Sequence, residues 1–141
     1  MSQRPGVGCG AAILRDDRIL LVERRTPPEA GYWNLPGGKV DFLERVEAAV
    51  LREIREEVGV EIALGPLLGV TEMIGIDGQH WVSPIYRARI VSGEPHNREP
   101  DKIARIAWFS LDAPPAPLAQ GAKDAIEALR KMPLPKKQAQ G

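Results

Sequence analysis

The sequence contains a single cysteine, Cys9, among its 141 residues. An intrachain disulfide and a cysteine-rich zinc site are therefore excluded. Neither sign of charge is in excess, because 19 lysines and arginines balance 19 aspartates and glutamates. Proteins that bind nucleic acid generally carry a basic excess. We therefore expect no nucleic-acid polymer as a partner.

Long hydrophobic runs are missing as well. The longest uninterrupted aliphatic stretch covers residues 19–22 (ILLV), whereas a membrane-spanning helix needs about 20 apolar residues. The chain opens with MSQRPGVGCG and has no apolar run behind a basic start, so no signal peptide is visible. These features predict a soluble, cytoplasmic protein without a membrane partner.

The remaining composition is that of a globular protein, with 43% apolar and 27% charged residues. The length suits one domain, which we place over residues 1–132. A domain of this size buries enough surface to fold without disulfides or structural zinc. Residues 133–141 have no apolar face to bury, which predicts a disordered tail.

Hydrophobic periodicity and turn residues predict several short strands and two helices. We expect strands at 6–15, 18–25, 67–76, 80–91 and 103–109, a broken extended segment at 32–40, a helix at 41–58, and a C-terminal helix with Leu118, Ala122, Ile126 and Leu129 on one stripe. This order indicates an α/β fold in which helices flank a mixed sheet.

Local signals refine the ends of these elements. Residues 41–44 (DFLE) fit a capping box with Asp41 as the N-cap, and Gly59 lies where a C-cap would stop the helix. Asp77-Gly78 predicts a tight hairpin between two strands. Pro84 lacks a backbone N–H, so its strand is expected at the edge of the sheet or to contain a bulge.

The first helix carries the most informative pattern. Glu53, Glu56 and Glu57 fall at i, i+3 and i+4, which places their carboxylates on one side of the helix. Like charges at this spacing repel each other, so the arrangement becomes favourable when a divalent cation lies between them. Mg²⁺ and Mn²⁺ prefer such oxygen ligands.

A simpler alternative is a solvated helix face on which these glutamates pair with Arg52 and Arg55. The flanking residues favour the metal site. Gly37 and Gly38 precede the helix as a phosphate-binding loop would. Glu44 adds a further carboxylate near the start of the helix.

The segment from Gly38 to Val60 resembles the signature of the Nudix hydrolases, GX5EX7REUXEEXGU, in which U is aliphatic. Every fixed position is filled, by Gly38, Glu44, Arg52, Glu53, Ile54, Glu56, Glu57, Gly59 and Val60. Residues 33–39 (WNLPGGK) resemble the lead-in of MutT-like members, and residues 108–111 (WFSL) resemble their last strand. Many family members carry glycine at the position before the first glutamate, where this sequence has Leu43. The resemblance covers most of residues 6–130 and implies a Nudix-type α/β/α sandwich.

The resemblance also implies an activity, the cleavage of a nucleoside diphosphate linked to another moiety. Family members use a divalent metal, Mg²⁺ or alternatively Mn²⁺, and a water that attacks phosphorus. By this likeness Glu53, Glu56 and Glu57 are metal ligands, together with the backbone carbonyl of Gly38. The bound cations then supply the positive field that the neutral chain lacks.

Other catalytic roles follow from the same resemblance. Glu44 and Arg52 resemble the pair that holds the loop against the helix, although Glu44 could also act only as a capping residue. The general base is either a glutamate of the signature, Glu53 or Glu56, or a carboxylate on a distant loop. Glu99 is the candidate for the loop position, and a solvated loop charge is its alternative.

Several residues are candidates for binding a small-molecule nucleotide. Arg24, Lys39 and the Gly37 loop could meet phosphates, while Trp33, Tyr32, His80 and Trp81 could stack on a base. The alternatives are surface charge for Arg24 and Lys39, ordinary burial for the tryptophans, and a turn residue for His80. Cys9 is expected to be an inert core residue.

Four functions remain to be compared. The first is hydrolysis of a (deoxy)nucleoside triphosphate to the monophosphate and pyrophosphate, which the short chain and MutT-like lead-in favour. The second is hydrolysis of ADP-ribose or a nucleotide sugar. A non-catalytic nucleotide-sensing module would usually have lost signature carboxylates, and a plain structural domain would leave the clustered glutamates unexplained. The protein is expected to be a monomer or a homodimer.

Overall fold

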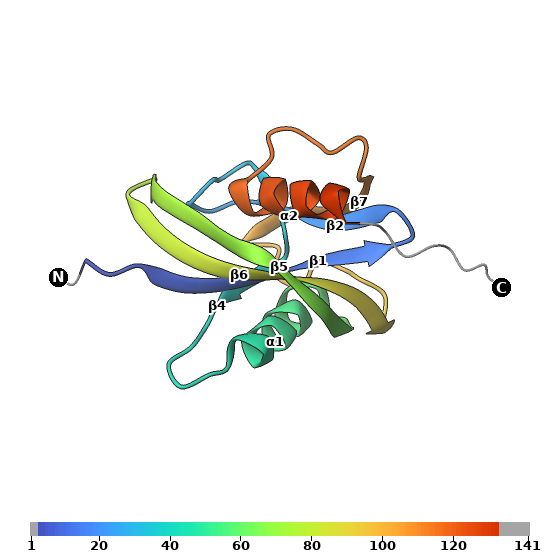
Figure 1. Ribbon diagram of the computed structural model, residues 1–141, viewed down its shortest axis with the longest axis horizontal. Coiled ribbons are helices and arrows are strands. Elements are labelled where there is room, and N and C mark those ends of the chain that lie inside the picture. Colours follow the sequence, from blue (N-terminus) through green and yellow to red (C-terminus); the bar gives the residue numbers. More distant parts are fainter. Residues whose placement is uncertain (1–2, 133–141) are drawn as a thin grey trace.

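The computed structural model describes residues 3–132, which form seven strands and two helices in three layers (Figure 1). The elements are β1 (Gly6–Arg15), β2 (Arg18–Arg24), β3 (Trp33–Asn34), β4 (Gly37–Lys39), α1 (Val46–Val58), β5 (Glu61–Ile76), β6 (Gln79–Ser92), β7 (Ile103–Ser110) and α2 (Gln120–Lys131). The predicted tail at 133–141 lies outside the described residues. No helix within residues 3–132 is long and apolar enough to cross a membrane.

The sheet is mixed, as predicted. Its strands follow the order β3-β2-β1-β6-β5, while β4 pairs with β1 and β7 pairs with β2. β1 and β6 run parallel, and the other pairs are antiparallel. Helix α1 covers one face of the sheet and α2 covers the other (Figure 1). The predicted α/β sandwich is therefore confirmed.

Each helix packs its apolar stripe against alternate residues of the central strands. Leu20 and Val22 of β2 belong to the core beneath α1, whereas Ile19 and Leu21 belong to the core beneath α2. Successive side chains of a strand point to opposite faces, so a strand covered on both faces is apolar throughout. This explains why six consecutive residues of β1 are buried.

The start of α1 differs from the prediction. The helix begins at Val46 with Arg45 as its N-cap, and no side chain caps it. Leu43 adopts a left-handed conformation (φ 68°), which interrupts helical geometry after residue 42. Only one of the two side-chain bonds of a capping box forms, from the Asp41 N–H to Glu44 Oε1 at 3.0 Å. The Glu44 N–H donates instead to the backbone carbonyl of Asp41 at 3.0 Å, and both bonds close a turn ahead of the helix. The end of α1 is as predicted, because Gly59 is a left-handed C-cap (φ 73°).

The long hairpin of β5 and β6 confirms one prediction and corrects two. Asp77-Gly78 forms its turn, with positive φ at both residues. β5 begins at Glu61 rather than at residue 67, and its register shifts between Leu64 and Gly69 let it continue through the Gly-Pro pair. The predicted edge position of Pro84 is wrong, because β6 lies between β1 and β5.

The β1–β6 ladder accommodates Pro84 by skipping it. Val7 pairs with Val82, and the next pair is Gly10 with Ile85, so residues 83 and 84 are left out of this ladder. The ladder therefore needs no N–H from the proline. The bulges lie instead in the neighbouring strand β5.

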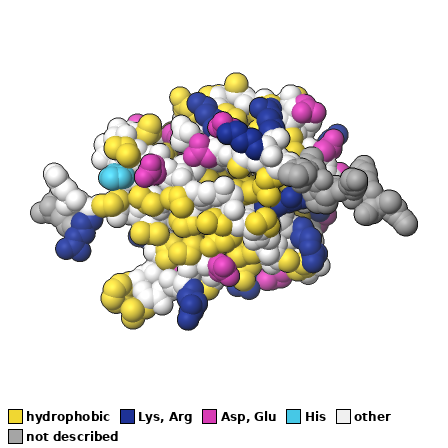
Figure 2. Space-filling view, in the orientation of Figure 1, with side chains coloured by type: hydrophobic (Ala, Val, Ile, Leu, Met, Phe, Trp, Pro, Cys, Tyr) yellow, Lys and Arg dark blue, Asp and Glu magenta, His cyan; other side chains and the backbone are white. Residues whose placement is uncertain are grey.

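Apolar side chains gather on part of the surface. Figure 2 shows them as a band across the middle of one face of the molecule. Large apolar side chains that are more than a third exposed include Val7 of β1 and Leu67, Val70, Ile74 and Ile76 of β5. The loop before α1 adds Phe42 and Leu43, about nine-tenths exposed at 91% and 90%. The outer strand β5 is therefore largely apolar along its exposed side.

Candidate active site

A cavity of about 350 Å³ lies where four segments meet, and we call it the acidic cavity. Its walls come from the end of β2, from β4, from α1 and from the loop at residues 93–102. Residues predicted from the sequence that line it are Arg24, Gly37, Gly38, Lys39, Glu53, Glu57 and Glu99. The fold therefore brings together candidates that lie up to 75 positions apart in the chain.

The two glycines of β4 permit a close approach between β1 and α1. A side chain at Gly37 would overlap the Cys9 carbonyl, and one at Gly38 would overlap the Glu53 carboxylate. The backbone N–H of Gly37 donates a hydrogen bond to Glu57 Oε1 at 2.8 Å. Only glycine allows the helix carboxylates to lie directly against this strand.

Arg52 ties the loop before α1 to the helix. Its guanidinium donates to both oxygens of Glu44, at 2.8 and 2.9 Å, and to the Lys39 carbonyl at 3.0 Å. It also donates to Glu53 at 3.0 Å and to Glu56 at 3.3 Å. The hydrogen bonds from Arg52 lower the pKa of Glu44 to about 2. Arg52 and Glu44 are thus paired as the sequence predicted.

Burial changes the protonation of the helix carboxylates. It raises the pKa of Glu57 to about 8, against the lowering effect of the hydrogen bond from Gly37. Burial also raises the pKa of Glu53, while Arg52 opposes this shift. The negative charges of Glu53 and Glu99 raise the pKa of Glu57 further. Burial in the acidic cavity therefore destabilises the charged forms of both helix carboxylates.

The three signature glutamates do not form a ready-made cage. Within residues 3–132, no three acidic, histidine or cysteine side chains converge closely enough to hold a metal ion. Arg52 binds Glu53 and Glu56, whereas Glu57 turns to the N–H of Gly37. The donor set nevertheless fits a hard divalent cation, because it offers carboxylate oxygens on successive turns of the helix.

Glu99 approaches the helix from the other side of the acidic cavity. Its backbone N–H donates to Asn97 Oδ1 at 3.0 Å, and its carbonyl accepts from the N–H groups of Lys102 and Ile103. These bonds fix the loop backbone next to the start of β7. A loop carboxylate is thereby held in the same cavity as Glu57.

Arg24 lines both the acidic cavity and a second, adjoining cavity described below. Its guanidinium donates to the carbonyls of Pro28 at 2.8 Å and Pro27 at 3.5 Å. Burial lowers the pKa of Arg24, and the nearby charges of Glu57 and Glu29 oppose this shift. Arg24 therefore presents a positive charge beside the carboxylates.

Three predicted substrate contacts are placed elsewhere. Trp33 is only 6% exposed, and its ring packs edge-on against Phe109 at 4.9 Å in the core beneath α2. The structure therefore places Trp33 in the core and not in a base-binding pocket, because β3 directs its ring toward α2. His80 and Tyr32 are exposed and line neither of the cavities that hold the other candidates.

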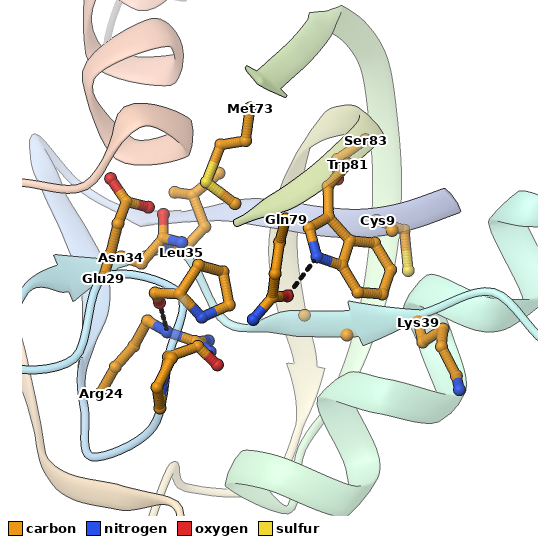
Figure 3. A pocket seen from close by; sticks show the side chains of 15 residues that line it. Cys9, Arg24, Glu29, Asn34, Leu35, Lys39, Met73, Gln79, Trp81 and Ser83 are labelled. Carbon is orange, nitrogen blue, oxygen red and sulfur yellow. Dashed lines mark hydrogen bonds between the residues drawn. The ribbon is translucent and has the colours of Figure 1, made fainter. Parts of the chain in front are cut away.

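A second cavity of about 270 Å³ adjoins the first, and we call it the hairpin cavity (Figure 3). It shares Arg24, Leu35 and the β4 residues with the acidic cavity. Lining residues that the sequence analysis missed are Glu29, Asn34, Met73, Gln79 and Ser83. Gln79, Trp81 and Ser83 are alternate residues of β6, so their side chains point to the same face of the strand. This alternation is the sequence signal that could have placed Gln79 and Ser83 beside the predicted candidate Trp81.

Glu29 and Asn34 also cap α2, whose own N-cap, Ala119, has no polar side chain. Glu29 Oε2 accepts from the N–H of Gln120 at 3.1 Å, and Asn34 Oδ1 accepts from the N–H of Ala122 at 3.1 Å. Free N–H groups at a helix start require such partners. One wall of the hairpin cavity is therefore joined to the C-terminal helix.

An α/β sandwich with a glycine strand, a glutamate-bearing helix and a loop carboxylate around one cavity is the arrangement of a Nudix hydrolase domain. Residues 4–130 match the model of the NUDIX domain family, and the chain belongs to this family.

Relatives of known structure and curated relatives agree with this assignment. A MutT NUDIX hydrolase from Burkholderia pseudomallei is 53% identical and superposes with a TM-score of 0.83, covering 90% of this chain and 99% of that one. A putative 8-oxo-dGTP diphosphatase 2 of Mycobacterium tuberculosis is 40% identical over 92 residues, or 62% of this chain. An ADP-ribose pyrophosphatase of Methanocaldococcus jannaschii is 38% identical over 91 residues, or 64% of this chain. The matches span only 63% and 54% of these two curated relatives.

Proposed function

We propose that the protein is a metal-dependent pyrophosphohydrolase whose substrate is a (deoxy)nucleoside triphosphate, and whose products are the monophosphate and pyrophosphate. The observation that carries the proposal is the acidic cavity, in which Glu53, Glu57 and Glu99 lie beside the basic groups of Arg24 and Lys39. Divalent cations would pair with these carboxylates, and the oxygens of a diphosphate would pair with the cations and the two basic side chains.

Glu53, Glu56 and Glu57 would hold Mg²⁺, with Mn²⁺ as an alternative, and the carbonyl of Gly38 would add an oxygen. The ion supplies neutralisation of phosphate charge and a lower pKa for a bound water. The raised pKa values of Glu53 and Glu57 support this assignment, because a nearby cation removes the penalty that burial places on their charged forms.

The chain's own groups perform the remaining tasks. Glu99 accepts the proton of the attacking water, a role supported by its position across the acidic cavity from Glu57; Glu53 and Glu56 are the alternatives. Lys39 and Arg24 orient phosphate oxygens, and Gly37 leaves room for them. Arg52 is a positioning residue that holds Glu53 and Glu56 while Glu44 fixes its guanidinium.

Two relatives bear on the choice of substrate. A triphosphate is supported by the relative named for 8-oxo-dGTP. ADP-ribose is supported by the relative named for that substrate. We favour the triphosphate because the small hairpin cavity accommodates one base, whereas ADP-ribose carries a second sugar that needs its own space.

The test is a side-by-side assay of the nucleoside and deoxynucleoside triphosphates, 8-oxo-dGTP and ADP-ribose with Mg²⁺. We expect a triphosphate to have the highest kcat/KM and to release pyrophosphate without orthophosphate. Glu57→Gln should abolish nearly all turnover, and Glu47→Gln on the exposed side of α1 should retain it. A clear preference for ADP-ribose refutes the substrate assignment, and full activity of Glu57→Gln refutes the site. Cleavage of no substrate would favour a nucleotide-sensing module.

A further inference from the structure

One wall of the hairpin cavity contains an amide whose orientation is fixed. The indole Nε1–H of Trp81 donates a hydrogen bond to Gln79 Oε1 at 2.7 Å (Figure 3). An indole N–H can only donate, so it selects the oxygen of the Gln79 amide. The amide nitrogen of Gln79 consequently points away from Trp81 toward the open part of the cavity (Figure 3). The wall therefore presents a hydrogen-bond donor.

The ring of Trp81 is itself held against the sheet. Gly6 pairs with Trp81 across β1 and β6, and a side chain at Gly6 would come within 2.6 Å of the ring. The glycine therefore lets the Trp81 ring lie on the backbone of β1. From this position, part of the ring faces the cavity. Met73 of the neighbouring strand lines the same space. Together they form an apolar and aromatic surface suited to a flat ring.

The position of this wall indicates what it contacts. The hairpin cavity and the acidic cavity share Gly37, Gly38 and Lys39, so a ligand with phosphates over these residues extends directly into the hairpin cavity. The volume of about 270 Å³ is close to the lower end of ligand pockets, roughly 300–1,000 Å³. A nucleobase is the part of a nucleotide that matches a small cavity with an aromatic wall.

We propose that Gln79, oriented by Trp81, makes the enzyme select nucleobases that present a carbonyl oxygen over those that present an amino group. This inference rests on the proposed function and specifies its substrate class. A carbonyl of guanine, hypoxanthine, uracil or thymine accepts from the amide nitrogen of Gln79. An exocyclic amino group at that position faces a second donor and leaves both unpaired, which costs about 1–3 kcal/mol or roughly 5–150-fold in affinity.

The test compares ITP with ATP, whose bases carry a carbonyl and an amino group at the same ring carbon. We expect the wild-type protein to prefer ITP by about tenfold or more in kcat/KM. Gln79→Glu replaces the donor by an acceptor and should reverse the preference. Trp81→Phe keeps the aromatic ring but removes the N–H, so the Gln79 amide can turn and the preference should fall toward unity.

The control is Glu72→Gln, an exposed position of β5 on the same hairpin that does not line the cavity. It should retain the wild-type ratio, and thermal melts establish that all variants are folded. Equal cleavage of ITP and ATP by the wild-type protein, or an unchanged ratio in Trp81→Phe, overturns the inference while the hydrolase function stands. If neither nucleotide is cleaved, the full panel of triphosphates decides the proposed function, and calorimetric binding of the α,β-methylene analogues of ITP and ATP decides the base preference separately.

Discussion

At the scale of single residues, Glu57 shows how the site can lower the stability of the fold. Its carboxyl has a pKa of about 8 in the folded protein, because burial penalises the charged form. The ordinary value is 4.5. The folded state therefore binds this proton more tightly than the unfolded chain does. This contribution to stability is fully present below pH 4.5 and is lost as the pH rises toward 8.

We expect the melting temperature of the metal-free protein, measured in a chelator, to fall as the pH rises from about 4.5 to about 8. Glu57→Gln cannot ionise, so its melting temperature should fall less over this interval and should equal or exceed that of the wild-type protein near pH 8. Calorimetric melts at a series of pH values provide the measurement. Glu47→Gln, exposed on the same helix, is the charge-matched control, and a Glu57→Gln curve parallel to the wild type would contradict the burial of a charge at this position.

Arg52 is the second residue whose role can be isolated. It contacts Glu44, Glu53 and Glu56 simultaneously, so its removal disorders ligands without deleting any of them. We expect Arg52→Ala to lose activity by about 10–100-fold, as is typical of groups that orient metal ligands. The loss should appear as a higher Mg²⁺ concentration for half-maximal rate, which steady-state kinetics over a Mg²⁺ series would measure.

Arg55 provides the matched control for that experiment. It lies on the same helix and pairs with Glu61 at 2.8 Å, away from the acidic cavity. Arg55→Ala should leave the Mg²⁺ dependence unchanged. If Arg52→Ala behaves in the same way, Arg52 belongs to a solvated helix face.

The residues that sequence could predict share a local origin. Glu53, Glu56 and Glu57 are related by helical spacing alone, and the signature adds Glu44 and Arg52. Glu29 and Asn34 depend on contacts between distant segments, such as the 88 positions that separate Asn34 from Ala122. The core position of Trp33 likewise depends on where α2 packs. Periodicity along one strand carries no information about these neighbours.

At the scale of elements, the two ends of α1 show which local signals determine a boundary. Gly59 ends the helix as predicted, because its left-handed conformation and short-range bonds to Ile54 and Arg55 carbonyls involve only adjacent residues. The start was predicted five residues too early. Residues 41–44 form an isolated turn instead, and the ion pairs of Arg52 with Glu44 and Asp41 stabilise that turn.

Gly59 offers a test of this C-cap. An alanine would be strained at φ 73°, and its Cβ would lie about 2.5 Å from His96 Cε1. We expect Gly59→Ala to reduce the free energy of unfolding by about 1–2 kcal/mol, measured by urea denaturation. Gly31 also has positive φ (85°) but has open space around it, so Gly31→Ala should show the strain without the contact. An equal loss in both variants would mean that His96 moves aside freely.

At the scale of the whole molecule, the caps of α2 connect the hairpin cavity to the core beneath α2. Asn34 Oδ1 accepts hydrogen bonds from Leu35 at 2.8 Å and from Ala122 at 3.1 Å, and thereby links β3 to the helix. We expect Asn34→Ala to reduce the free energy of unfolding by about 0.5–2 kcal/mol and to raise KM for the nucleotide. Lys123→Ala, at an exposed position of α2, should change neither. Paired denaturation and kinetic measurements would show whether stability and KM change together, and a stable variant with normal KM would refute the link.

The same link has a consequence for the order of events during biosynthesis. Glu29 leaves the ribosome 91 residues before its partner Gln120, and Asn34 leaves 88 residues before Ala122. Until α2 emerges, Glu29 and Asn34 lack these bonds to the helix, although the whole signature helix has already been synthesised. We therefore expect a nascent chain arrested before residue 120 to lack high-affinity nucleotide binding. The growing polypeptide would acquire high-affinity binding only after α2 has emerged.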